Sequence, residues 1–207
     1  MKKLLVIAFS LFIVIALSSS ALACACCAER GTYDMWSGAA DSYHLGLLKD
    51  MRFGKTAELY MTASAFDSIK GIAEIEKEID GGTTGDFNII DAYTNNTWRL
   101  DIKTPGGKAG TLVLPRPARM SIVKIDTHEN SEANTEITVY KEFQFRGPVR
   151  SGGGIFRGGL RSPVSYQLIF QGRGNMCDNA EDFTFWRLEI TGAKASYAFF
   201  GPMKSSS

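Results

Sequence analysis

The sequence predicts an all-β protein, a single-domain antiparallel β-sandwich with one or two short helices, and a β-barrel is the alternative. The first observation is that apolar and polar residues alternate over many segments, as in strands with one buried face. The second is that these segments are rich in aromatic and β-branched residues, which strands favour. The third is that turn residues separate the segments at short intervals. We find no repeat of propeller or solenoid length.

The predicted strands are five clearly alternating segments and three shorter ones. Apolar residues at every second position of the longer segments are expected to face the core. These inward-facing residues are Leu59, Met61 and Ala63; Trp98, Leu100 and Ile102; Ile137, Val139, Phe143 and Phe145; Tyr166, Leu168 and Phe170; and Trp186, Leu188 and Ile190. The shorter strands are expected at Thr111–Leu114, Met120–Ile125 and Ala195–Phe200.

Turn residues connect these strands. Asn95-Asn96 lies between an apolar segment over 87–94 and the strand over 97–103, which predicts a tight hairpin. Gly192 separates the last two strands and predicts a second hairpin. These short turns favour antiparallel pairing between successive strands.

Two segments have helical rather than alternating periodicity. Asp41–Arg52 is expected to form a short amphipathic helix, because its apolar residues recur about once per helical turn. Their face consists of Tyr43, Leu47 and Met51, with Leu48 beside it. A second short helix is expected over Ser68–Asp80, where one face would carry Ile69, Ile72, Ile75 and Ile79.

Composition excludes several classes of protein. The chain has 207 residues, of which 44% are hydrophobic and 22% charged, so it is neither disordered nor fibrous. The formal net charge of +1 argues against a nucleic-acid partner, since such proteins are usually strongly basic. Two histidines in the whole chain exclude a histidine-rich metal site.

The first 23 residues are expected to be a signal peptide. Lys2 and Lys3 precede an apolar run over 4–17, and Ala21-Leu22-Ala23 ends it as a small-residue cleavage site. The run is too short to span a membrane, and no other long apolar run follows, so no transmembrane segment is expected in the mature chain. Residues 24–207 would then form one β-rich domain with a cysteine-containing N-terminal segment, exported to the periplasm or the cell exterior of a bacterium.

Cys24 would be the first residue of the mature chain. A cysteine directly after a small residue at the end of a signal is also what lipoprotein processing requires. Ala21 stands where lipoprotein signals usually carry an aliphatic residue such as leucine, which favours soluble export. Lipidation of Cys24, and a membrane anchor through it, is the close alternative.

The four cysteines are the most unusual feature. Cys24, Cys26 and Cys27 fall within four residues, and Cys177 is the only other cysteine. Outside the cytoplasm such residues usually form disulfides, and we predict a bond from Cys177 to Cys26 or Cys27, because adjacent cysteines strain when bonded to each other. The alternative is a thiolate site for copper or zinc made by all four cysteines.

A glycine-rich segment over 146–161 carries four arginines and no acidic residue. Its functional interpretation is an anion-binding loop, for a phosphorylated lipid or an acidic glycan, because arginine recognises carboxylate and phosphate groups by paired hydrogen bonds. The favoured interpretation is a flexible solvated loop between two strands. In either case the four side chains should be largely exposed; they are Arg146, Arg150, Arg157 and Arg161.

A third segment, Asp178–Asp182, is rich in side-chain oxygen. Hard cations such as Ca²⁺ favour such ligands. The spacing does not match a calcium-binding loop, so an ordinary turn with Asn or Asp caps leading into the next strand is the better interpretation.

Signatures of catalysis are otherwise absent from the sequence. His44 and His128 are expected to be structural or solvated, and Trp36 could stack on a sugar. The leading hypothesis is a non-enzymatic exported protein that binds an unknown ligand or has a structural role in the cell envelope, with no catalytic residues and no cofactor. A copper- or zinc-binding thiolate protein and a carbohydrate-active β-sandwich are the alternatives.

Overall fold

The structure is a computed structural model that describes residues 33–60, 69–73, 75, 84–126, 139–175 and 177–204. Its strands are β1 (Tyr33–Ala39), β2 (Thr56–Tyr60), β3 (Thr84–Thr94), β4 (Thr97–Lys103), β5 (Ala109–Pro115), β6 (Arg119–Asp126), β7 (Val139–Pro148), β8 (Ser151–Gly154), β9 (Val164–Gly174), β10 (Phe183–Gly192) and β11 (Ala195–Pro202). The helices are α2 (Ser42–Asp50) and the 3₁₀ turns η2 (Gly159–Arg161) and η3 (Ala180–Asp182).

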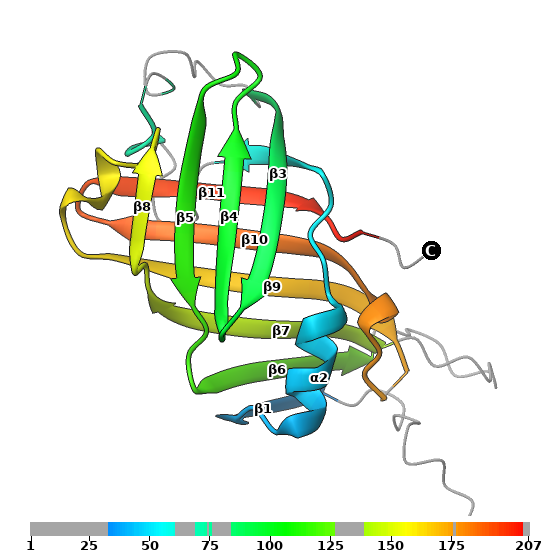
Figure 1. The fold of residues 1–207 in the computed structure, drawn as a ribbon. Coiled ribbons are helices and arrows are strands. Elements are labelled where there is room, and N and C mark those ends of the chain that lie inside the picture. Colours follow the sequence, from blue (N-terminus) through cyan, green and yellow to red (C-terminus); the bar gives the residue numbers. More distant parts are fainter. Residues whose placement is uncertain are drawn as a thin grey trace, which may run out of the picture.

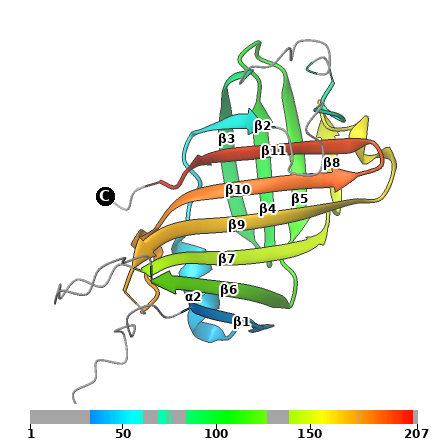
Figure 2. The same ribbon diagram turned by 180° about the vertical axis from the view of Figure 1, so that it is seen from behind.

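All eleven described strands belong to one antiparallel sheet, in the order β1-β6-β7-β9-β10-β11-β2-β3-β4-β5-β8. The sheet folds over so that β3, β4 and β5 run across β7, β9 and β10, as Figures 1 and 2 show from opposite sides. The inner faces of the two layers meet where Trp98 packs on Phe145 with ring centroids 5.0 Å apart. Phe87 and Phe199 make a second contact of this kind at 5.4 Å. The described sheet ends at β1 and β8 without closing, which confirms an all-β, sandwich-like fold.

Much of the core consists of the residues that alternation places inward. Trp98, Leu100 and Ile102 are at most 2% exposed, and the inward residues of β9 and β10 are equally buried. Val139, Phe143, Phe145 and Leu59 are buried as predicted, whereas Met61, Ala63 and Ile137 lie outside the described residues. The shorter strands also form, as β5, β6 and β11.

The asparagine hairpin forms as predicted between β3 and β4. Asn95 and Asn96 have φ values of 50° and 56°. A two-residue hairpin of this type needs positive φ at both positions, and asparagine tolerates that conformation better than most residues. The β10–β11 hairpin forms as well, because Gly192 pairs with Ala195 at its base.

The predicted first helix is α2, and Asp41 caps it by accepting a hydrogen bond from the backbone N–H of His44 at 2.9 Å. The predicted face is only partly right: Leu48 and Met51 are buried, but Tyr43 is 51% exposed. In Figure 1 the helix lies at one end of the sandwich, beside η3. Its inner side therefore contacts the core through Leu48, while Tyr43 points sideways toward the loop before η3.

The predicted second helix over Ser68–Asp80 is wrong for the part that the structure describes. Lys70 pairs with Ser196 of β11 through two backbone hydrogen bonds of 3.0 Å, and Gly71 has a φ of 91°. Both features are incompatible with a continuous helix. The isoleucines still serve the core, because Ile69, Ile72 and Ile75 are buried, but they do so from an irregular segment anchored on β11.

Two strands were not predicted. β1 carries residues with little alternation, and every residue of it except Gly38 is exposed. β8 consists of Ser151 and three glycines, so it has no side-chain pattern to detect. It nevertheless pairs with β5, where the positive φ of Gly154 brings its backbone against the Ala109 carbonyl. The segment over 146–161 is therefore the end of β7, an edge strand and a 3₁₀ turn rather than a flexible loop.

No helix within the described ranges is long and apolar enough to cross a membrane.

Candidate functional site

Two lysines face each other on the inner side of neighbouring strands. Lys124 of β6 is the direct partner of Lys141 in β7. The Lys141 side chain is fully buried, and the Lys124 side chain is 12% exposed. Like charges directly opposite in a sheet repel, and a buried charge is costly unless it is paired. This pair therefore requires carboxylates.

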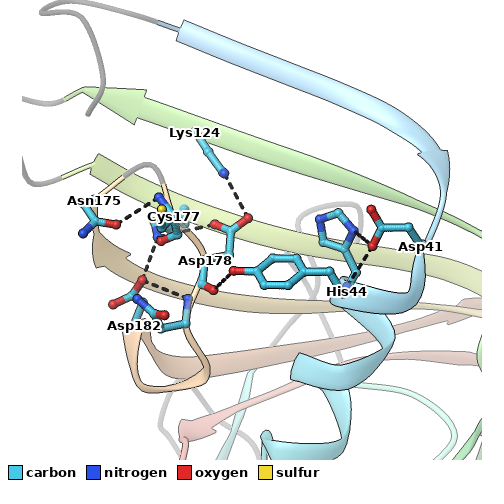
Figure 3. Close-up of polar contacts among 10 residues, drawn as sticks. Asp41, His44, Lys124, Asn175, Cys177, Asp178 and Asp182 are labelled. Carbon is cyan, nitrogen blue, oxygen red and sulfur yellow. Dashed lines mark hydrogen bonds and ion pairs between the residues drawn. The ribbon is translucent and has the colours of Figure 1, made fainter. Parts of the chain in front are cut away.

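Two aspartates from the β9–β10 connection supply those carboxylates (Figure 3). Asp178 lies 2.9 Å from the Lys124 ammonium and 3.4 Å from that of Lys141. Asp182 accepts a hydrogen bond of 2.7 Å from Lys141, which also donates to the Cys177 carbonyl at 2.5 Å. The Asp178–Lys141 contact is an ion pair without hydrogen-bond geometry. The charges of the two lysines are thus matched by those of the two aspartates.

Further hydrogen bonds hold the loop that carries Cys177. The Asn175 side chain accepts from the Cys177 N–H at 2.9 Å, and the Tyr43 hydroxyl donates to the Asp178 carbonyl. Asn179 caps η3, and its own N–H donates to the Asp182 carboxylate at 3.3 Å. The interpretation of 178–182 as a turn with side-chain caps is confirmed. Its two aspartates form ion pairs with Lys124 and Lys141.

Glycines at the end of β9 make room for Asp182. A side chain at Gly172 would overlap the Asp182 carbonyl oxygen, and one at Gly174 would overlap its carboxylate. Neither glycine is needed for a positive φ. Their role is to let the loop approach the strand closely enough for Asp182 to reach Lys141.

Lys141 was missed by sequence reasoning, although a signal for it exists. The inward positions of β7 are Val139, Lys141, Phe143 and Phe145, so a lysine interrupts an apolar face. A charged residue at such a position requires a buried partner. The partner itself could not be identified, because Asp178 and Asp182 are brought near only by the folding of the β9–β10 connection.

A second basic pair lies at the other end of the same strands, on the outer face. Continuing the register from Ser121 opposite Gln144 places Arg119 of β6 beside Arg146 of β7. Both arginines are exposed and line a surface hollow of about 460 Å³. The hollow's other polar residues are Ser37, Ser121 and Gln144, next to three apolar ones.

The two guanidinium groups have neutral partners. Arg119 donates to the Ser37 carbonyl at 3.1 Å. Nη2 and Nε of Arg146 face the Gln167 amide, and when the amide is turned so that its oxygen points to the guanidinium, they donate to that oxygen at 3.0 and 3.3 Å. Among the described residues no carboxylate forms an ion pair with either arginine. This pair therefore differs from the lysine pair in having no anion supplied by the described chain.

The four predicted arginines are all exposed, as expected, but only Arg146 lines the hollow. Arg150 follows β7, Arg157 lies in a turn, and Arg161 ends η2. The sequence did not identify Arg119, which lines the same hollow as Arg146. Its place depends on the register of β6 against β7, and the long connection between these strands hides that register in the sequence.

The histidine on α2 has structural contacts. His44 Nδ1 lies 2.7 Å from the Asp41 carboxylate, and its ring stacks on Trp36 at 6.0 Å. The backbone N–H of His44 lowers the pKa of Asp41, with a smaller contribution from the imidazole. His44 therefore belongs to the cap of α2, which agrees with the structural role expected of it. Trp36 packs on the His44 ring and is itself 41% exposed.

The cysteine predictions concern residues that the structure describes only in part. Cys24, Cys26 and Cys27 lie outside the described residues. Lipidation of Cys24, the bond from Cys177 to Cys26 or Cys27, and the copper or zinc site of all four cysteines therefore stay predictions. Within the described ranges no group of three or more His, Cys, Asp or Glu residues could hold a metal ion.

Comparison with known proteins leaves function to be inferred from these contacts. No protein-family model, curated protein or solved structure matches the chain. The chemistry of the two basic pairs is thus the evidence that bears on function.

Proposed function

We propose that this protein is a non-enzymatic exported binding protein that takes an anionic ligand in the hollow at Arg119 and Arg146. The observation that carries the proposal is the exposed pair of neighbouring arginines whose partners among the described residues are neutral. Two guanidinium groups side by side attract an anion, and each has a planar set of N–H donors that fits carboxylate, sulfate or phosphate.

Unused donors support this assignment. A guanidinium has five N–H groups, and Arg119 makes one hydrogen bond to a described residue. Arg146 uses Nε and Nη2 toward Gln167, which leaves its remaining N–H groups for a ligand. Since the hollow is open to solvent, an anion can reach both arginines without a change of fold.

A titration followed by amide NMR tests this proposal. Sodium sulfate is added at constant ionic strength against sodium chloride, with the protein in its exported form. We expect shifts concentrated at Ser37 and over 119–121 and 144–146. The variant Arg119→Gln/Arg146→Gln should lose them, whereas the matched variant Arg150→Gln/Arg157→Gln, which removes the same charge elsewhere, should keep them. Equal shifts in both variants, or none in the native chain, would overturn the proposal.

Export is part of the same proposal. Residues 1–23 act as the signal peptide, and the mature chain begins at Cys24 in the periplasm or outside the cell. The intact mass of the protein recovered from its own compartment tests this. A mass starting at Cys24 supports soluble export, an added lipid mass selects the anchored alternative, and a retained Met1 would contradict both.

We also propose the disulfide from Cys177 to Cys26 or Cys27. The fixed position of the Cys177 backbone supports this pairing. Lys141 and Asn175 hold its backbone from two sides, so the sulfur has a fixed starting point. Peptide mapping without reduction should recover Cys177 joined to the N-terminal peptide. Recovery of Cys177 as a free or metal-bound thiol would contradict the pairing.

A further inference from the structure

We infer that the anion recognised in the hollow is the carboxylate of an acidic sugar, a uronate. The inference rests on the proposed anion site and names its ligand class. Its observations are the size of the hollow and the mixture of charged donors, hydroxyls and one acceptor that lines it: Arg119, Arg146, Ser37, Ser121 and Gln144.

The size of the hollow exceeds the need of a free oxyanion. About 460 Å³ lies in the range of sites for organic small molecules, which is roughly 300–1,000 Å³. Its opening toward solvent leaves room for a sugar that continues into a longer chain. A carboxylate on the two arginines would therefore fill only part of the space and leave room for a sugar ring attached to it.

The lining beyond the arginines fits hydroxyl groups better than a second oxyanion. The Ser121 hydroxyl donates to the Ser37 hydroxyl at 3.1 Å, so Ser37 keeps its own O–H for a ligand. The Gln144 amide nitrogen donates to Glu142, and its oxygen has no donor among the hydrogen bonds of the described residues. That oxygen accepts a hydrogen bond from a sugar hydroxyl, whereas the oxygens of a dianion such as sulfate only accept and would meet it unfavourably.

Glucuronate, glucose and sodium sulfate serve as probes, each titrated into the exported protein by calorimetry at matched ionic strength. We expect glucuronate to bind at least tenfold more tightly than glucose, because only the former has a carboxylate for the arginines. We also expect it to bind more tightly than sulfate, because only the sugar has hydroxyl groups that can donate to the Gln144 oxygen.

Substitutions separate the two parts of the site. Arg119→Gln/Arg146→Gln should abolish binding of glucuronate and sulfate alike. Gln144→Leu should weaken glucuronate about tenfold, as loss of one hydrogen bond to a ligand does, and should not weaken sulfate, which cannot donate to the Gln144 oxygen. Ser121→Ala provides a second, smaller change with the same direction, and thermal unfolding of each variant confirms that the sheet is intact.

The outcomes distinguish the two proposals. If sulfate binds as tightly as glucuronate and Gln144→Leu changes neither, the uronate inference is overturned while the anion site stands. If glucose binds as tightly as glucuronate, the carboxylate has no role and the uronate inference is likewise overturned. If neither anion binds, the proposed function and this inference both fail.

Discussion

Strands β6 and β7 carry two pairs of basic residues that differ in burial and in their counter-ions. The pair Lys124 and Lys141 faces the interior, where two aspartates neutralise it. The pair Arg119 and Arg146 faces solvent, where its described partners are a carbonyl and an amide oxygen. The comparison teaches that burial decides whether the chain must supply its own counter-ions. Where the pair is exposed, water screens the repulsion and an external anion can take the place of the aspartates.

The interior pair also organises the structure around it. One loop brings both aspartates, and Lys141 in return fixes the carbonyl of Cys177 and the end of η3, directly before β10. Among the described residues, the arginine side chains are held only by the Ser37 carbonyl and the Gln167 amide. We therefore expect substitutions in the first pair to change the free energy of unfolding and substitutions in the second to change binding.

The largest effect is expected for Lys141→Met, which leaves the buried Asp178 with Lys124 alone and takes the lysine partner from Asp182. Removing one partner of a buried ion pair costs about 3–5 kcal/mol. The matched control is Arg146→Met, an exposed change that should stay within about 0.5 kcal/mol. Urea denaturation of both variants measures the difference. Equal losses would mean that the two pairs are energetically alike, and the comparison would fail.

The second effect sharpens the role of the loop. Gly172→Ala places a side chain against the Asp182 carbonyl, so the loop must retreat from Lys141. Such overpacking costs about 1–3 kcal/mol. Gly153→Ala is the control, because a side chain there meets nothing within 4 Å. Thermal unfolding should show a loss for the first variant and almost none for the second; similar losses would remove the loop from the explanation.

Alternation alone could predict most of this fold, since Trp98, Tyr166 and Trp186 lie where an every-second-residue pattern places them. It could not predict β8, whose glycines carry no pattern, or the segment at Lys70, where pairing with β11 overrides helical spacing. The site was harder still. Arg146 could be identified as a candidate, but its neighbour Arg119 is defined by strand register, which the sequence does not reveal.

The third effect concerns the exposed pair itself. Arg119→Gln/Arg146→Gln should keep the free energy of unfolding within about 0.5 kcal/mol of the native value. At low salt the double variant should be slightly more stable than the native chain, because the repulsion between the two like charges is removed. Chemical denaturation at low and high salt measures this. A marked loss of stability would show that these arginines have a structural partner after all, as the lysines do.

The smallest effect is expected at Asp41, an exposed carboxylate whose pKa is lowered by the His44 backbone N–H. A lowered folded-state pKa stabilises the protein above the ordinary value of 3.8, and this contribution is lost as the pH falls below 3.8 through the lowered value. Asp41→Asn keeps a capping oxygen but cannot titrate. The melting temperature of this variant should therefore fall less steeply between pH 5 and about pH 2; parallel curves would contradict the role of the Asp41 charge.

The claim that the exposed arginines accept an external anion is tested most directly by the stabilisation that sulfate confers. Sulfate stabilises folded proteins in general, so the informative quantity is the difference between variants at equal ionic strength. An anion that binds the folded state adds free energy of unfolding by mass action. We predict that sulfate stabilises the native chain and Arg150→Gln/Arg157→Gln equally, and Arg119→Gln/Arg146→Gln less. Equal stabilisation of all three proteins would contradict an anion site at Arg119 and Arg146.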